Sequence, residues 1–208
     1  MLLSGGIDSA TCLRLVGEKY RTRALTFLYH GIAEREVKAA LATGGSQSIL
    51  EHRMVRLPDL REAEDIGVEF RGLPPTYIPM RNAVFYSLAA SYAEEVGVDL
   101  IIGWHNRDDI EVFPDAGDGF FESMEGTIRA GSQALRRREV KILRPLSRYR
   151  KHQVVRLAVS KGVPLELTWS CHRGGSRHCW KCDGCLARRK AFLKARVSDP
   201  LDGRGKIS

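Results

Sequence analysis

Apolar residues recur every three or four positions in five stretches of the chain, a spacing that places them on one face of a helix. The first stretch follows an opening turn and aligns Ala10, Leu13 and Val16. The most regular one runs from Met80 to Val96. We therefore expect helices over residues 9–20, 33–52, 80–96, 120–135 and 151–161, with Gly44 and Gly45 interrupting the second.

Short apolar runs separate these helices and have the length of strands. The run "VDLIIGW" at 98–104 is continuously apolar, as is typical of a strand buried on both faces of a parallel sheet. Strands are expected at residues 2–3, 23–29, 53–57, 98–104 and 140–146, with loops at 59–76 and 106–119. Because strands and helices alternate, the pattern predicts an α/β fold with a mostly parallel sheet flanked by helices.

Composition and charge add limits to this picture. The 208 residues are enough for one compact unit, and no apolar run approaches the ~20 residues that span a bilayer. The sequence does not open with a basic segment followed by an apolar one, so we expect a cytoplasmic protein. The net charge of +8 arises in basic clusters at 136–138, 148–151 and 188–190, which either hold a polyanion or form a solvated face.

The stretch "SGGIDS", which begins at Ser4, lies between an expected strand and an expected helix. In an open α/β sheet, ligands bind beyond the carboxyl ends of the strands, where a helix N-terminus presents N–H groups to anions. Gly5 and Gly6 let the backbone approach a ligand closely. Ser4 and Ser9 add hydroxyl donors, and Asp8 can hold Mg²⁺. These features suit a pyrophosphate, although a plain glycine turn with a helix cap has a similar pattern.

Four of the five cysteines crowd into fifteen residues with the spacing C-x₇-C-x₂-C-x₂-C, and they are Cys171, Cys179, Cys182 and Cys185. Four thiolates in a short loop can complete the tetrahedral shell of a structural zinc ion. The two C-x₂-C steps that share one cysteine also occur in iron–sulfur sites. His172 and His178 are possible substitute ligands. The spacing therefore predicts a metal centre near the C-terminus.

Together the two motifs resemble those of the PP-loop ATP pyrophosphatases, and in particular those of the 7-cyano-7-deazaguanine synthase (QueC-type) family. The resemblance covers nearly the whole chain and is carried by "SGGIDSAT", "TYIPMRN", "TWSC" and "CWKCDGCLARRKAF". It implies a Rossmann-like, adenine nucleotide alpha hydrolase-like domain over residues 1–165. A zinc-binding segment over 166–208 would pack on that domain in a single compact unit.

The resemblance also implies an ATP-dependent carbon–nitrogen ligase. Such an enzyme converts 7-carboxy-7-deazaguanine and ammonia to 7-cyano-7-deazaguanine through an adenylated carboxylate and an amide, in the biosynthesis of queuosine and archaeosine precursors. Mg²⁺ and Zn²⁺ are the implied metals, a homodimer is the implied assembly, and nucleic acid is not a required partner. Since the sequence contains no glutaminase domain, free ammonia is the simplest nitrogen source.

Carried onto this sequence, the family motifs assign candidate site residues. The ATP phosphates and Mg²⁺ would contact Leu3, Ser4, Gly5, Gly6, Asp8, Ser9, Arg81 and Asn82. The candidate catalytic residues are Asp8, Arg81, Asp115 and Lys151: Arg81 for a phosphate or carboxylate, Asp115 for the purine-like edge or the metal, and Lys151 for a second phosphate contact. A surface ion pair for Arg81 and a solvated helix position for Lys151 are the structural alternatives. Trp169 either stacks on a base or is buried in the core.

The loop at 106–119 departs from the family pattern. "FPDAGDGF" stands where the family usually has "YPDCRPEF", so that Gly117 replaces an arginine, and "HNRDDIEV" replaces "NAVDYSGY". Either Arg107 supplies the missing charge, or the protein activates a different acid. Two other functions stay open: a PP-loop enzyme that modifies tRNA bases, and a non-catalytic zinc- and nucleotide-binding subunit. Exposed aromatic residues at 113–121 could contribute to a dimer.

Overall fold

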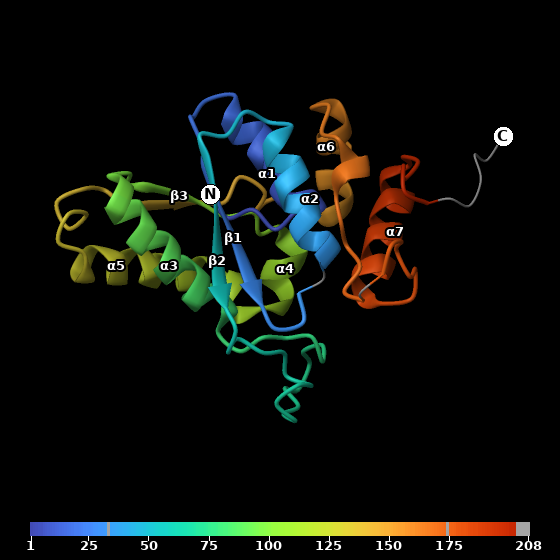
Figure 1. Ribbon diagram of the computed structural model, residues 1–208, viewed down its shortest axis with the longest axis horizontal. Helices are drawn as coiled ribbons and strands as arrows, with labels where there is room; N and C mark the ends of the chain where they lie inside the picture. The colour runs from blue at the N-terminus through green and yellow to red at the C-terminus, as the bar shows by residue number, and fades with distance from the viewer. Residues whose placement is uncertain (33, 174, 203–208) are drawn as a thin grey trace.

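Helices and strands alternate along the chain (Figure 1), in a computed structural model that describes residues 1–32, 34–173 and 175–202. The elements in order are α1 (Ile7–Gly17), β1 (Arg23–Tyr29), α2 (Glu34–Gly45), β2 (Glu51–Leu57), α3 (Arg81–Val96), β3 (Leu100–Ile102), α4 (Arg107–Val112), the 3₁₀ turn η1 (Pro114–Ala116), α5 (Asp118–Gly131), β4 (Lys141–Leu143), α6 (Lys151–Ser160), the 3₁₀ turn η2 (Leu165–Leu167) and α7 (Asp183–Ala195). The predicted α/β class is confirmed. Residues 203–208 of the expected C-terminal segment and residue 33 of the expected second helix lie outside the described residues.

The strands form two parallel pairs that residues 1–3 connect. β1 pairs with β2 over seven residues, and β3 pairs with β4 over three. Leu2 forms a parallel bridge with Leu25 of β1, and its N–H donates to the carbonyl of Ile102 in β3 at 3.0 Å. The spatial order is therefore β2, β1, residues 1–3, β3, β4. This order is that of doubly wound nucleotide-binding folds, in which ligands bind beside the middle strand.

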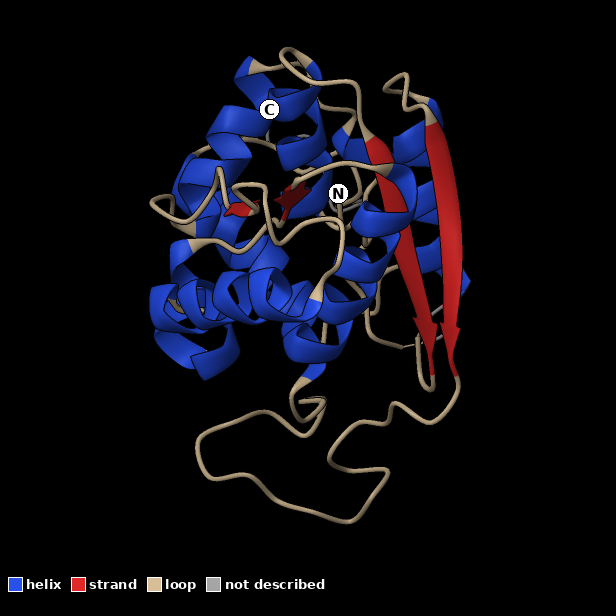
Figure 2. Cartoon of the chain, turned by 90° about the vertical axis from the view of Figure 1, so that its left-hand side faces the viewer, coloured by secondary structure: helices blue, strands red, loops and turns tan. Residues whose placement is uncertain are grey.

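Helices cover this sheet because their apolar positions match it. Figure 2 shows the long β1–β2 pair at one side of the helices. Eight of the eleven residues of α1 are buried, since the helix packs near the middle of the fold. α2 ends at Gly45, where the glycine pair interrupts the pattern. β3 is shorter than expected, and the loop expected at 106–119 instead contains α4 and η1.

The C-terminal segment packs on α1 and α6 through α7, a helix that the sequence analysis did not anticipate. Ile7, Val154 and Phe192, one residue from each of these helices, belong to one buried cluster. Arg188 of α7 is fully buried and forms a two-pronged ion pair with Asp199, at 2.6 and 2.9 Å. Such a bidentate pair satisfies the buried guanidinium, which would otherwise be costly to desolvate.

A long loop between β2 and α3 projects from one end of the molecule (Figure 1). It resembles the loop expected at 59–76, and its last residues return to the sheet beside α3. Among the described residues, no helix is long and apolar enough to cross a membrane.

Candidate active site and metal centre

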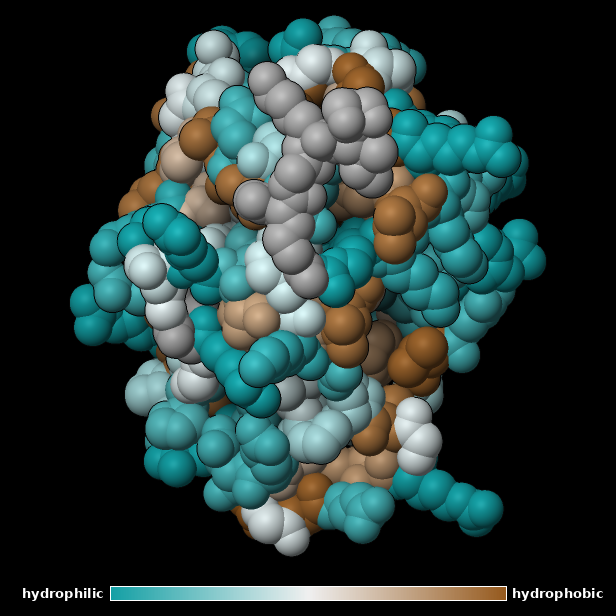
Figure 3. All heavy atoms as spheres, turned by 90° about the vertical axis from the view of Figure 1, so that its right-hand side faces the viewer, coloured by the Kyte–Doolittle hydropathy of each residue, from teal (hydrophilic) through white to brown (hydrophobic). Residues whose placement is uncertain are grey.

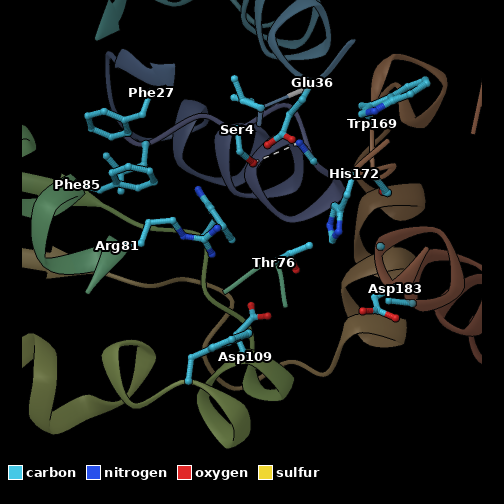
Figure 4. Close-up of a pocket in the computed structure, with 18 of the residues that line it drawn as sticks. Ser4, Phe27, Glu36, Thr76, Arg81, Phe85, Asp109, Trp169, His172 and Asp183 are labelled. Carbon is cyan, nitrogen blue, oxygen red and sulfur yellow. Dashed lines mark hydrogen bonds between the residues drawn. The ribbon is translucent and has the colours of Figure 1, made fainter. Parts of the chain in front are cut away.

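A cavity of about 560 Å³ opens at the carboxyl ends of residues 1–3 and β1, where the strand order changes direction. One side is apolar: Phe27 and Phe85 stack with ring centroids 4.2 Å apart. The opposite side comes from the C-terminal segment, with Trp169, His172 and Asp183. Figure 4 shows these two sides facing each other across the cavity. Half of the predicted nucleotide-binding and catalytic residues line this cavity, namely Leu3, Ser4, Gly6, Arg81 and Lys151.

The loop after residues 1–3 is held in shape by its own hydroxyls and by α2. The Ser9 hydroxyl accepts the Gly5 N–H at 3.1 Å and donates to the Gly6 carbonyl at 3.0 Å. Gly5 has φ +82°, and a Cβ there would lie 2.5 Å from the Ala40 nitrogen and 2.7 Å from the Glu36 carbonyl oxygen. Only glycine fits both conditions. Helix α1 then begins without a side-chain cap, so its first N–H groups are available for an anion.

Asp8, near the end of this loop, has two polar partners. Its side chain is buried and forms an ion pair with Lys151, and its other oxygen accepts from the Asn106 amide at 3.4 Å. Burial lowers the pKa of Lys151, but the attraction of Asp8 and Asp109 outweighs it and raises that pKa. Burial and the charge of Asp8 raise the pKa of Asp109 to about 6. The structure therefore brings Asp8 and Lys151, two candidate site residues, side by side, and Asp109, which the sequence analysis did not select, lies close to both.

Arg81 and Asn82 begin α3, and Arg81 borders both the main cavity and a smaller one beside it, whereas Asn82 borders only the smaller one. Arg81 lines the main cavity and points into it in Figure 4. Asn82 is buried, and its backbone N–H donates to the Asp115 carboxylate at 3.1 Å while its amide donates to the Asp115 carbonyl at 2.9 Å. Asp115 thus holds the start of α3 in place. Both Asn82 and Asp115 border a second cavity of about 30 Å³ beside the main one.

Glu36 is a cavity residue that the sequence analysis did not select. It lies in the first turn of α2, and in Figure 4 its carboxylate is close to Ser4. Burial raises the pKa of Glu36 to about 7, even though the charge of Arg81 opposes the shift. No motif marks this position. The expected helix at 33–52 was the one signal that could have placed it near the end of a strand.

The four cysteine sulfurs of the C-terminal segment lie within 4.8 Å of one another. Two sulfur pairs, Cys179–Cys185 and Cys171–Cys182, are 3.8 and 3.9 Å apart. A tetrahedron with metal–sulfur bonds of about 2.3 Å has edges of about 3.8 Å, so this geometry fits one ion. The N–H groups of Lys181 and Cys182 donate to Cys179 and lower the pKa of that thiol to about 6. The predicted cluster can hold a metal ion.

The cysteine segment contacts the loop at Ser4–Ser9 directly. The Trp169 N–H donates to the Gly5 carbonyl at 2.9 Å, and its indole N–H donates to the Cys171 carbonyl at 2.7 Å. The Trp169 ring lies 4.2 Å from that of His178, whose Nε2 accepts from the Ser170 N–H at 3.1 Å. His178 therefore holds the cysteine segment in shape. Trp169 borders the cavity and connects the Ser4–Ser9 loop to the cysteine segment through its two hydrogen bonds.

For the loop at 106–119, the structure does not support one of the two alternatives for Arg107 or the expected exposed aromatic residues. Arg107 does not supply a cavity charge, because its side chain is 58% exposed and pairs with Glu111 on the surface of α4. The aromatic residues at 113–121 are not an exposed group: Phe121 is buried in the core, and Phe113 stacks near Tyr77 at the cavity wall. The cations that line the main cavity, among the described residues, are Arg81 and Lys151.

Comparisons with known proteins show which family the chain resembles. The family model described as "Queuosine biosynthesis protein QueC" matches residues 1–196. A 7-cyano-7-deazaguanine synthase of Thermoplasma acidophilum is 36% identical, over 97% of this chain and 90% of its own length. A protein of the same name from Acetivibrio thermocellus is 33% identical, over 97% and 96%. The structure of NMN synthetase from Francisella tularensis superimposes with a TM-score of 0.55 at 19% identity, and the match covers 95% of this chain and 76% of that one.

The strand order and the glycine-rich loop at its switch point define a nucleotide-binding α/β protein, and the similarity to NMN synthetase supports the fold. The sequence matches go further, because they extend over almost all of the chain. The chain belongs to the QueC family.

Proposed function

We propose that this protein is an ATP-dependent ligase that converts 7-carboxy-7-deazaguanine and ammonia to 7-cyano-7-deazaguanine. The observation that carries the proposal is the joining of the Ser4–Ser9 loop to the cysteine segment around one cavity, in a chain of the QueC family. Family members with this name match along nearly their whole length. The reaction activates the acid as an acyl-adenylate, forms an amide with ammonia, and then activates and dehydrates that amide.

In this proposal the Ser4–Ser9 loop binds the β- and γ-phosphates of ATP. The free N–H groups at the start of α1 and the Ser4 hydroxyl face the leaving pyrophosphate, and the helix dipole favours its charge. Lys151 lies at the same end and adds a fixed positive charge. These donors stabilise charge that grows as the bond between the α- and β-phosphates breaks, which is where such groups accelerate a reaction most.

We assign Mg²⁺ to Asp8, whose carboxylate is a hard oxygen ligand next to the phosphate loop. When bound, the ion would shield the phosphate oxygens. Lys151 would then move from Asp8 to the phosphates, since both groups cannot keep the same partner. Arg81 points into the cavity and is placed to orient the carboxylate of the acid toward the α-phosphate.

The two sides of the cavity suit two flat ring systems. The apolar side with Phe27 and Phe85 fits adenine, which needs contact area more than charge. On the other side, the Asp183 carboxylate and the His172 imidazole can accept the N–H groups of a deazapurine, while Trp169 offers a ring for stacking. We therefore place the acid next to the cysteine segment.

We assign zinc to Cys171, Cys179, Cys182 and Cys185. Four protein ligands close the coordination shell, so the ion holds the segment in place and takes no part in bond making. The short sulfur–sulfur distances support a single ion over a two-iron cluster, whose cysteines would be spread over two metals. Residues 166–202 would then be the zinc-binding segment, and residues 1–165 the nucleotide-binding domain.

We further propose a homodimer that acts in the cytoplasm. Leu186 and Leu193, seven residues apart on α7, are 47% and 70% exposed, and Val159 of α6 is 49% exposed. Figure 3 shows the side of the molecule with α6 and α7, where apolar side chains alternate with charged ones. Free thiols gathered for a metal suit a reducing compartment. Light scattering on the purified protein, with Leu193→Glu as the variant expected to be monomeric, tests the assembly.

The activity test is direct. The purified protein is incubated with ATP, Mg²⁺, ammonium and 7-carboxy-7-deazaguanine, and the products are identified by mass spectrometry. We expect the nitrile together with AMP and pyrophosphate. Pyrophosphate released without nitrile would indicate a related reaction that stops at the adenylate or amide. ATP left intact with this acid, but consumed with another carboxylate, would move the proposal to that substrate.

A further inference from the structure

A second, smaller cavity lies against the main one. Its volume is about 30 Å³, enough for one or two molecules of the size of water. The two cavities share a wall, to which Tyr77, Arg81, Trp104, Asp109 and Phe113 all contribute. A small molecule held there is separated from the main cavity only by side chains that border both spaces.

The lining of the small cavity contains polar atoms that lack partners in the described part of the chain. His105 is only 3% exposed, and its Nε2 has no hydrogen-bond partner there; the same is true of the buried Trp104 Nε1. Burial and the nearby charges of Arg81 and Arg144 lower the pKa of His105 to about 3, so its ring stays neutral. Buried polar atoms normally have partners, so these two point to a small polar occupant.

The occupant must be small, and it must both donate and accept hydrogen bonds. A neutral imidazole can accept one hydrogen bond, the carboxylates of Asp109 and Asp115 accept, and the indole N–H donates. Arg81 adds one positive charge at the shared wall, opposite in sign to the two carboxylates. We propose that this cavity is the ammonia site of the ligase, from which NH₃ enters the main cavity past Asp109 and Arg81. The assignment rests on the proposed function, which needs ammonia as a second substrate.

The site would serve the step in which ammonia attacks the acyl-adenylate. Ammonium loses one proton to water and enters as NH₃. The lone pair of its nitrogen forms a C–N bond to the acyl carbon of the adenylate. The C–O bond to AMP breaks, AMP leaves with that electron pair, and one further proton passes from the nitrogen to water. No oxidant or reductant is needed.

The test separates adenylation from ammonia use. Exchange of labelled pyrophosphate into ATP, in the presence of the acid and the absence of ammonia, measures adenylation alone. His105→Phe keeps the ring shape but removes the acceptor, and His105→Gln keeps an acceptor. Ala116→Val fills the cavity, because Ala116 is buried at its wall, and Ala134→Val is the same change at an exposed position. Thermal unfolding checks that each variant folds.

We expect exchange to stay within twofold in all variants. The KM for ammonium should rise at least tenfold in His105→Phe and Ala116→Val, less in His105→Gln, and not at all in Ala134→Val. Unchanged ammonium KM in both His105→Phe and Ala116→Val, with exchange intact, would overturn the proposal and leave a structural water as the occupant. Absence of exchange in the wild-type protein would overturn the proposed function and this assignment with it.

A second measurement uses the size of the cavity. Methylamine is larger than ammonia, so the wild-type protein should form little N-methylamide from it. Ile78→Val enlarges the cavity by one methyl group, since Ile78 is buried at its wall, and should raise N-methylamide formation at least fivefold relative to amide formation. Equal use of methylamine by wild type and variant would contradict passage of the nucleophile through this cavity.

Discussion

The Ser4–Ser9 loop and the cysteine segment border the same cavity but acquire their shapes in different ways. The loop is fixed by the protein alone: Gly5 packs on the backbone of α2, and the Ser9 hydroxyl joins Gly5 to Gly6. The cysteine segment brings four thiols to one point, where they offer each other only weak hydrogen bonds. One side of the cavity therefore has its shape without a ligand, whereas the other would gain its stability from the ion proposed above.

The largest expected effect comes from removing that ion. If the cysteines hold zinc as proposed, Cys182→Ser should lose the metal, lower Tm by roughly 10 °C, and reduce activity at least a hundredfold, because the segment that carries Trp169 is no longer held. Zinc per chain by atomic absorption and calorimetry measure both effects. Cys12→Ser is the control, since this buried cysteine lies outside the cluster. Full activity in a zinc-free Cys182→Ser protein would show that the two sides are not coupled.

Gly5→Ala, in the Ser4–Ser9 loop, should reduce stability and ATP binding nearly as much. The new Cβ would meet the α2 backbone at 2.5 Å in a left-handed conformation, so we expect a loss of about 3 kcal/mol in stability and at least a hundredfold weaker ATP binding. Gly17→Ala is the matched control: a Cβ there meets nothing within 4 Å, and stability should change by less than ~1 kcal/mol. Chemical denaturation and ATP titration calorimetry provide the measurements. Wild-type ATP affinity in Gly5→Ala would refute a fixed loop.

Asp183→Asn should weaken the use of the acid substrate and leave the use of ATP unchanged. The amide keeps the shape but replaces one acceptor oxygen by a donor, so the KM for the acid should rise about tenfold while the KM for ATP stays within twofold. Steady-state kinetics at saturating ammonium distinguish the two. Equal changes in both KM values would indicate that Asp183 only helps to fold the start of α7.

The smallest expected effect is a change of ATP affinity with pH, caused by Glu36. Because the pKa of Glu36 is raised to about 7, the residue is largely protonated at pH 6 and largely anionic at pH 8. Its charge then repels ATP, so the Kd for ATP should increase about three- to fivefold from pH 6 to pH 8. Glu36→Gln should abolish most of this change. Wild type should also lose stability from pH 6 to pH 8, because the protonated Glu36 that favours the folded state is lost as the pH rises through its pKa. Glu36→Gln lacks this titration, so the variant should become more stable relative to wild type over the same pH range. An identical pH profile in the variant would exclude Glu36 as the cause.

Much of the fold could be predicted from the sequence because its signals are local. The apolar run at 23–29 matches β1, and the helical pattern from Met80 matches α3 within one residue at its start. The cysteine cluster was predictable for the same reason, since three of its ligands lie within seven residues. The α7 helix was missed because its amphipathic pattern is weak and it buries an arginine, Arg188, where a core residue is expected to be apolar.

Parts of the candidate site could not be predicted, because they depend on contacts between distant residues. Asp115 belongs to the quoted motif, yet its carboxylate holds the start of α3 beside the smaller cavity. Glu36 and Asp109 carry no motif and reach the site through the packing of α2 and α4. In the sequence, His105 is a single polar residue after an expected strand. Its importance becomes visible only in the structure, where it is buried and its Nε2 has no hydrogen-bond partner among the described residues.

The position of residues 1–3 has a consequence for how the protein folds. These residues are the seam between the β1–β2 pair and the β3–β4 pair, and their partners in β3 are about a hundred positions away along the chain. Closing so long a loop is entropically expensive, so each pair can form early while the seam closes late. The loop that follows the seam therefore takes its final shape only after both halves have met. Assembly of the nucleotide pocket would be a closing event of folding, and ATP added during refolding should accelerate recovery mainly at that stage.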